Sequence, residues 1–169
     1  VEFNVPPVNN SIDFYKNIET MFGYIRSIIP QGVDITTATS MQFDDKDLEH
    51  PQAKEGGCSA DYNAWELRVN NKPKLAKTNW RCAGAHLHFG YEGFNDETSI
   101  ELIKALDLTL GVTSIVIDQD IQRRKLYGRA GCFRMTHFGV EYRTPSPYYL
   151  ASQEFVDHVF KAIDMAVDI

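Results

Sequence analysis

Charged residues alternate with apolar residues and glycine in the stretch YGRAGCFRMTHFGVEYRTPSPYY, residues 127–149. A solvated charged segment would mix lysine and glutamate with other polar residues, but these charges stand among aromatic and apolar neighbours. They are Arg129, Arg134, Glu141 and Arg143. Because successive side chains of a strand point to opposite faces, the alternation predicts two strands, around 131–136 and 138–144, with Glu141 and Arg143 on one face.

The chain has 169 residues, and we expect a single domain over 1–169. Its net charge of −6 argues against a protein that coats nucleic acid, which needs a basic surface. No apolar stretch approaches the roughly 18 residues of a membrane span. Three cysteines without a CxxC pair favour the reducing cytoplasm over a disulfide framework. Because the chain starts without Met inside an expected strand, VEFNV, we expect an N-terminal portion to be missing.

Hydrophobic periodicity predicts further strands and helices along the chain. The expected strands lie at 1–5, at 33–43, within 58–69 and at 80–90. A polar loop is expected at 44–57. The expected helices run from a capping Ser11 to about Ile29, over 96–117, and over 152–169, where Phe155, Val159, Ile163 and Val167 form one stripe. This order predicts an α+β domain with a mostly antiparallel sheet and helices on one side.

Two histidines in the stretch GAHLHFG, His86 and His88, are two residues apart. On a strand this spacing points both imidazoles to one face, where they can share a ligand. Neutral imidazole binds metal ions and can hydrogen-bond a phosphate. A pair of half-buried histidines on a sheet face is the alternative, because H-x-H is a short motif with many chance occurrences.

The arginines favour a functional interpretation of these strands. A planar guanidinium binds phosphate or carboxylate through two parallel hydrogen bonds and stays charged when partly buried. Three arginines, one carboxylate and two histidines on neighbouring strands suit a site for metal and phosphates better than a core, where each buried charge needs a partner. For the pentapeptide GVEYR alone, a structural Glu141–Arg143 ion pair is the alternative.

Two further pairs offer the oxygen ligands that Mg²⁺ and Mn²⁺ prefer. Asp61 and Asn63 are two residues apart in CSADYNAWELRV, and Glu2 and Asn4 have the same spacing near the start. The alternatives are that Asp61 and Asn63 form a turn and that Glu2 is an exposed strand residue.

Five motifs, taken in order from residue 2 to about 150, carry a family resemblance. They are EFN, GCSADYNAW, RCAGAHLHFG, YGRAGCFR and GVEYRTPSPY. In this order the chain resembles the phage-type carboxylate–amine ligases of the glutamine synthetase and glutamate–cysteine ligase superfamily. The H-x-H strand and the last two motifs are the specific part. The resemblance implies a glutamine synthetase-like catalytic domain, with a curved antiparallel sheet backed by helices, that joins a carboxylate to an amine through an acyl phosphate.

The resemblance also implies ATP and Mg²⁺ or Mn²⁺ as cofactors, and roles for individual residues. The implied metal ligands are Glu2, Asp61, His86 and Glu141. The implied contacts to the nucleotide phosphates are His88 and Arg134. The implied catalytic residues are Arg129 and Arg134, at the phosphoryl group or the substrate carboxylate, and Arg143, at the substrate carboxylate. Asn4 and Asn63 stand where glutamine synthetase has glutamates, which leaves the number of metal ions open.

The expected partners are a small-molecule or peptide carboxylate and an amine, with no nucleic acid and no membrane, and an oligomer stays open. Two other functions fit parts of the sequence. A non-catalytic virion component or regulatory subunit could retain the ligase fold, since fold does not fix function. A cupin-like metal enzyme would use HLHFGYE, but Trp80 stands where a cupin has glycine, and no second cupin motif follows.

Overall fold

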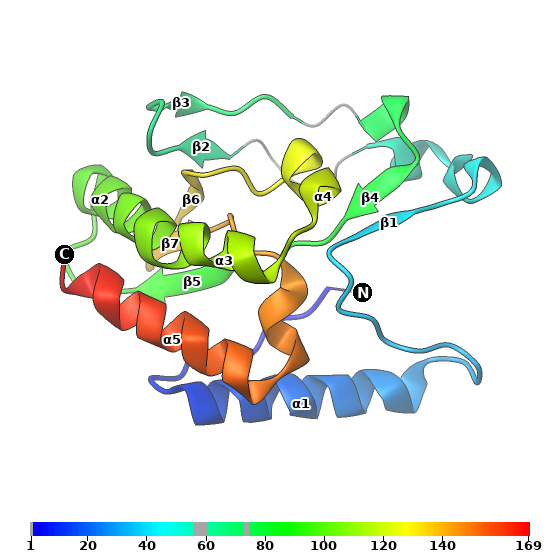
Figure 1. The fold of residues 1–169 in the computed structure, drawn as a ribbon, viewed down its shortest axis with the longest axis horizontal. Coiled ribbons are helices and arrows are strands. Elements are labelled where there is room, and N and C mark those ends of the chain that lie inside the picture. Colours follow the sequence, from blue (N-terminus) through cyan, green and yellow to red (C-terminus); the bar gives the residue numbers. More distant parts are fainter. Residues whose placement is uncertain (1, 56–60, 73–74) are drawn as a thin grey trace.

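The computed structural model describes residues 2–55, 61–72 and 75–169, and these ranges form an α+β structure (Figure 1). Their main sheet has five strands in the order β3-β2-β6-β7-β5, and each neighbouring pair is antiparallel. The strands are β2 (Tyr62–Asn63), β3 (Arg68–Val69), β5 (Leu87–Gly90), β6 (Cys132–Thr136) and β7 (Gly139–Tyr142). A second, two-stranded antiparallel sheet pairs β1 (Ser40–Gln42) with β4 (Trp80–Cys82). The predicted α+β class with a mostly antiparallel sheet is confirmed.

The register of three neighbouring strands brings three polar residues into a row. Glu141 of β7 is directly opposite His88 of β5 on one side and Arg134 of β6 on the other. Opposite residues of an antiparallel pair lie on the same face, with Cβ atoms about 5 Å apart. Strand pairing alone therefore forms the row His88–Glu141–Arg134 across the sheet.

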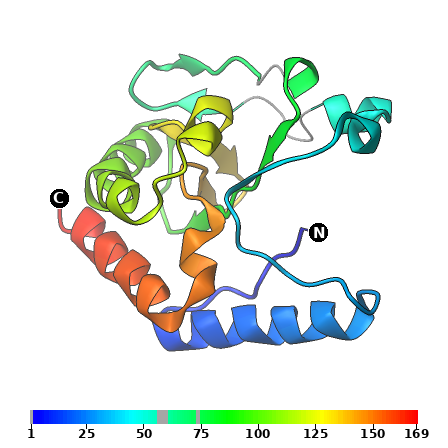
Figure 2. The ribbon, with the colours of Figure 1, turned by 45° about the vertical axis from the view of Figure 1, so that its right-hand side comes forward.

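Helices cover the opposite face of this sheet. α2 (Asp96–Leu106) packs against β6 and β7, and α5 (Gln153–Val167) packs against both α2 and α1 (Ser11–Ile28), as Figure 2 shows from a second side. The fully buried side chains between these layers include Ile103, Leu106, Val140, Tyr142, Val156 and Val159. Because Val140 and Tyr142 alternate with Glu141, β7 sends its apolar side chains to the helices and its charge to the other face, called the polar face below.

The expected helix at 96–117 is present but changes its pitch in the middle. Asn95 caps α2, accepting the Thr98 amide at 3.0 Å, while Thr98 Oγ1 accepts the Asn95 amide at 3.1 Å. α2 then continues through a π-helical turn, η4 (Asp107–Gly111), into α3 (Val112–Ile117). A short helix, α4 (Ile121–Leu126), follows. None of the helices that the structure describes is long and apolar enough to cross a membrane.

Several predicted strands are shorter than expected. Residues 2–7 form no strand, and Phe3 and Val5 pack against the core instead. The strand expected at 33–43 is reduced to β1. The strand expected at 80–90 is divided into β4 and β5, because residues 83–86 form no strand pairing. The two strands belong to different sheets. Within 58–69, residues 58–60 lie outside the described ranges, and the rest forms the β2–β3 hairpin.

Two helix details are also wrong. Asn10, not Ser11, caps α1, since its side chain accepts the Asp13 amide at 2.8 Å. In α5 the buried stripe consists of Val156, Val159, Ala162 and Ala166, whereas Val167 is exposed. The apolar residues of α5 occupy more than half of its circumference, so periodicity alone could not decide which edge of the stripe is buried.

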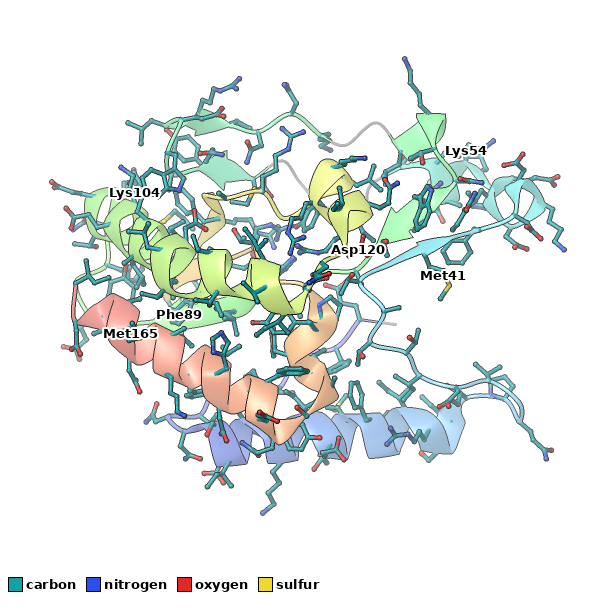
Figure 3. The ribbon with its side chains drawn as sticks, viewed as in Figure 1. Met41, Lys54, Phe89, Lys104, Asp120 and Met165 are labelled. Atoms are coloured by element: carbon teal, nitrogen blue, oxygen red, sulfur yellow. The ribbon has the colours of Figure 1, made fainter. Side chains whose placement is uncertain are left out.

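Of the polar loop expected at 44–57, residues 56–57 lie outside the described ranges, and the rest belongs to an arm, which we define as β1, β4 and the 3₁₀ turns η1 (Asp45–Leu48) and η2 (Pro51–Lys54). Within the arm, Arg81 donates to the Ala53 carbonyl from Nε at 2.8 Å and from Nη2 at 2.5 Å. The arm is joined to the body at Asp120, whose Oδ2 accepts the hydroxyls of Thr39 and Ser40 at 2.6 and 2.5 Å. Figure 3 labels Met41 and Lys54 on the arm and Asp120 beside it.

Candidate functional site

Glu141 is the centre of a charged cluster on the polar face. Its Oε2 accepts hydrogen bonds from Nε and Nη2 of Arg134, both at 2.7 Å. Its Oε1 accepts one from Arg143 Nη1 at 2.7 Å, and lies 2.7 Å from His86 Nδ1 and 3.8 Å from His88 Nε2. The structure thus brings together five residues that the sequence singled out, from three strands and the segments flanking them.

Glu141 carries a fixed negative charge although its side chain is only 2% exposed. Burial acts to raise its pKa, but the hydrogen bond from His86, the charges of Arg143 and His86 and the hydrogen bond from Arg134 outweigh burial and lower the pKa to about 2. Each oxygen accepts hydrogen bonds from charged donors, which offset the loss of water. The carboxylate therefore holds the surrounding cations in place.

Tyr127 closes a ring of hydrogen bonds with His86, Glu141 and Arg143. Its hydroxyl lies 3.2 Å from His86 Nε2 and accepts a hydrogen bond from Arg143 Nη2. Because His86 Nδ1 faces a carboxylate oxygen, Nδ1 is the donor, and in the neutral ring Nε2 then accepts the Tyr127 proton. The Tyr127 ring also lies 5.6 Å from the guanidinium carbon of Arg143. The ring of bonds fixes the orientation of His86.

Asp61 extends the cluster on its buried side. Its Oδ2 lies 3.4 Å from Arg143 Nε, and its Oδ1 accepts Asn70 Nδ2 at 2.9 Å. Arg143 is only 1% exposed and bridges Asp61 and Glu141. A substrate carboxylate can reach Arg143 only if these contacts rearrange. The turn alternative holds for Asn63, whose Oδ1 accepts the amides of residues 65 and 66, both at 2.9 Å.

His88 and Arg134 stand at the accessible side of Glu141. Their side chains are 43% and 45% exposed. Burial lowers the pKa of His88, while the charge of Glu141 acts in the opposite direction. A neutral imidazole and a guanidinium fork are therefore the groups of this cluster that an incoming anion meets first.

Two predicted site residues, Arg129 and Glu2, are not joined to the cluster. Both side chains are exposed, and neither forms a hydrogen bond or ion pair with any residue in the described ranges. The Arg129 carbonyl accepts the Thr144 hydroxyl at 2.9 Å, and Arg129 is one of the residues that line a separate cavity on the helix side. The roles that the resemblance implies for Arg129 and Glu2 stay predictions.

Sequence reasoning missed Arg123, which joins the segments that carry the site. Its Nε, Nη1 and Nη2 donate to the carbonyls of Ala83, Thr144 and Pro145 at 3.1, 2.8 and 2.6 Å. It therefore fastens the segment before β5 to the segment after β7. Nothing in the motif IQRRKL distinguishes this buried arginine from its exposed neighbours.

The close packing of Arg123 requires glycine at position 128. Gly128 has a φ of +70°, and an added Cβ would lie 2.2 Å from Arg123 Nη1. The sequence did contain a signal for this region, since YGRAG places Tyr127 and two glycines beside the charged stretch. The aromatic hydroxyl of Tyr127 was the overlooked member.

The donor set offers two carboxylates and two imidazoles to a cation. No group of three or more His, Cys, Asp and Glu residues in the described part of the chain is arranged to hold a metal ion. Mg²⁺ is usually bound through one or two carboxylates plus substrate phosphates, and the types of donor at Asp61 and Glu141 fit that requirement. Because both Glu141 oxygens already accept hydrogen bonds, Arg134 has to leave Oε2 before that oxygen can bind a metal ion.

Comparison with known proteins identifies a family. The family model described as phage phiEco32-like COOH.NH2 ligase-type 2 matches residues 76–168, more than half of the chain. The matched segment contains β4 to α5, and with them all of the cluster except Asp61. No curated protein and no solved structure matches the chain significantly. By the extent of the family match, the chain belongs to the phage phiEco32-like, type 2 family of COOH.NH2 ligases.

Proposed function

We propose that the protein is an ATP-dependent ligase that activates a carboxylate as an acyl phosphate and joins it to an amine. The family match supports the coarse reaction class. The observation that carries the finer proposal is the convergence of two guanidinium groups and two imidazoles on Glu141. Such a cluster suits the transfer of a phosphoryl group, where catalysis consists mainly of positioning and charge stabilisation.

In the first step, a carboxylate oxygen of the substrate bonds to the γ-phosphorus of ATP. The bond from that phosphorus to the β–γ bridging oxygen breaks, and ADP leaves with the electron pair. Arg134 is placed to bind the equatorial oxygens of the transferred group, because its guanidinium is half exposed and already oriented by Glu141. His88, on the other side of Glu141, can hydrogen-bond a neighbouring phosphate oxygen.

In the second step, the amine nitrogen bonds to the acyl carbon, the bond from that carbon to the phosphate oxygen breaks, and the nitrogen loses a proton to water. Three further residues support Glu141 from its buried side and thereby keep its carboxylate in position during the reaction. They are Arg143, His86 and Tyr127. We assign them as positioning residues, since Arg143 is too buried to meet the substrate in this arrangement.

Asp61 and Glu141 are the residues that would hold Mg²⁺, and His86 would be a third ligand if its ring turned away from Tyr127. When bound, Mg²⁺ would draw charge from the β- and γ-phosphates. Arg134 would keep its role as the partner of the phosphate oxygens.

Calorimetric titration with a non-hydrolysable ATP analogue tests the proposal, first with Mg²⁺ and then with EDTA. We expect binding that requires Mg²⁺ and that is lost in His86→Ala and weakened about tenfold or more in Arg134→Lys, because an ammonium cannot reproduce the guanidinium fork. Arg129→Lys is the matched control. It should bind normally if the geometry is correct, whereas the role implied by the family resemblance predicts that it fails.

Turnover is tested by ADP release from ATP with mixtures of carboxylates and amines. Release that requires both substrates supports the ligase. Absence of nucleotide binding in either metal condition would overturn the proposal and favour the non-catalytic alternative, a family member that keeps the fold.

A further inference from the structure

A second concave site lies on the helix side of the main sheet. A cavity of about 410 Å³ opens between η4, α3, the loop at 128–130 and residues 144–146. This volume lies within the range of small-molecule sites, roughly 300–1,000 Å³. Asp107 lines the cavity and accepts the hydroxyl of Tyr142 at 2.7 Å, while the next residue along β7 from Tyr142, Glu141, points to the polar face. The cavity and the Glu141 cluster therefore lie on opposite faces of the sheet.

Asp107 makes one wall of the cavity rigid. Its Oδ2 accepts Trp65 Nε1 at 2.6 Å and the Gly131 amide at 2.5 Å, and its Oδ1 accepts Tyr142 and the Thr144 hydroxyl at 2.7 and 3.4 Å. Both carboxylate oxygens are thus saturated by donors of the protein itself. The indole that Asp107 holds is half exposed and forms a preformed aromatic wall.

The facing wall is an apolar stripe of the helical segment η4–α3. Leu108, Val112 and Ile115 line the cavity, and each is more than half exposed. They stand four and three residues apart, the spacing that places helical side chains on one face. Large aliphatic side chains that remain in water beside an aromatic wall favour an apolar ligand.

The lining of the cavity includes three arginines, Arg123, Arg124 and Arg129, and two aspartates, Asp107 and Asp118. Arg124 donates to the carbonyl of Asp118. The Asp118 carboxylate accepts hydrogen bonds from Ser146 Oγ at 2.6 Å and from the Asp120 amide at 3.0 Å. The Arg129 side chain, by contrast, has no hydrogen-bond or ion-pair partner among the described residues. It is a cation at the edge of an apolar surface, on a protein whose net charge is −6.

We propose that this cavity binds a ligand with an apolar body and a terminal carboxylate. The body packs between Trp65 and the stripe of Leu108, Val112 and Ile115, and the carboxylate pairs with Arg129. The charge of Arg129 favours an acid over an uncharged molecule of the same shape. This proposal is independent of the proposed ligase function, and neither one requires the other.

Fluorescence of Trp65 reports on the cavity directly. The chain has two tryptophans, Trp65 and Trp80, so the Trp80→Phe variant leaves one emitter in the cavity wall. The probe is 3-phenylpropanoate, with 3-phenylpropan-1-ol as its uncharged match. We expect a saturable change in emission with the acid and weaker binding of the alcohol.

Variants in the same background separate the two parts of the proposal. Arg129→Gln should weaken the acid by roughly threefold to fivefold and leave the alcohol unchanged. Val112→Glu should weaken both probes, because it places a charge in the apolar wall. Arg134→Gln, on the opposite face, is the control and should change neither.

Absence of a saturable change with the acid would overturn the proposal, as would equal binding of acid and alcohol or indifference to Arg129→Gln. Titration of the same samples with the Mg²⁺–nucleotide analogue keeps the two hypotheses distinct. Nucleotide binding without acid binding rejects only the cavity, and acid binding without nucleotide binding rejects only the ligase.

Discussion

At the scale of single residues, the site depends on one buried carboxylate whose desolvation cost is offset by three neighbours. Glu141 is ionised because Arg134, Arg143 and His86 donate to it. The same contacts make it a link between fold and function. Removing it leaves two guanidinium groups and an imidazole without their common acceptor, which is costlier than losing one surface ion pair.

Glu141→Gln should therefore destabilise the protein in a way that depends on pH. The native carboxyl has a pKa of about 2, below its ordinary value of 4.5, so its contribution is fully present above pH 4.5 and is lost as the pH falls towards 2. The lowered pKa corresponds to about 3 kcal/mol of unfolding free energy. Urea unfolding of both proteins should show a gap near neutral pH that narrows steadily below pH 4.5. A gap that stays constant down to pH 3 would mean that the charge of Glu141 is not the cause.

Tyr127→Phe tests the ring of hydrogen bonds. The change leaves His86 Nε2 and Arg143 Nη2 without the hydroxyl that joins them, and we expect a loss of about 1–2 kcal/mol of unfolding free energy. Tyr24→Phe is the matched control, because Tyr24 is exposed on α1 and should cost nothing measurable. Equal stability of the two variants in urea unfolding would argue against the ring.

At the scale of elements, the turn between β6 and β7 sets the register that aligns the site. Gly139 is opposite Gly90 of β5, with a φ of +153°, and an added Cβ would lie 1.9 Å from the Phe89 carbonyl oxygen. Gly139→Ala should cost at least about 2 kcal/mol of stability and displace β5 with His88.

Gly23→Ala is the control for Gly139→Ala. Gly23 lies in α1 with nothing within 4 Å of an added Cβ, so alanine should stabilise by about 0.5–1 kcal/mol. In thermal unfolding, we expect Gly139→Ala to lower the midpoint temperature and Gly23→Ala to raise it. A stable Gly139→Ala protein would contradict the proposed constraint on the β5–β7 ladder.

The sequence predicted some strands of the structure correctly and others not. Alternation in GVEYR and the H-x-H spacing predicted the strands that meet at Glu141, because a period of two decides which face each side chain takes. Of the strand expected at 1–5, the described residues 2–5 form none. This was not predictable, since a strand needs a partner and Phe3 instead packs against Phe22 of α1. The position of Arg129 was equally hard to foresee. It adjoins the site motif in sequence, but it lies between Gly128 and Gly131, both at positive φ, and is one of the residues that line the cavity on the helix side.

At the scale of the whole molecule, Asp120 and Arg123 of the body make polar contacts, within the described ranges, with the arm and the residues that flank it. Asp120 accepts both Thr39 and Ser40, and Arg123 donates to Ala83. The body, in contrast, has a continuous core that extends from the sheet through α2 and α5 to α1. Segments held by few buried apolar contacts open at lower free energy than the core. The arm should therefore open independently of the sheet that carries Glu141.

Native-state hydrogen exchange measures this opening. We expect the amides of β1 and β4 to exchange faster than those of β6 and β7, and Asp120→Ala to accelerate exchange in the arm while leaving β7 unchanged, because both hydroxyl contacts are lost at once. Asp44→Ala is the matched control. It removes an acidic residue of the same region whose ion pair with Lys46 is exposed and worth little, so arm exchange should not change. Equal protection of arm and sheet in the wild-type protein would instead show that the two open as one unit and would contradict an independent opening of the arm.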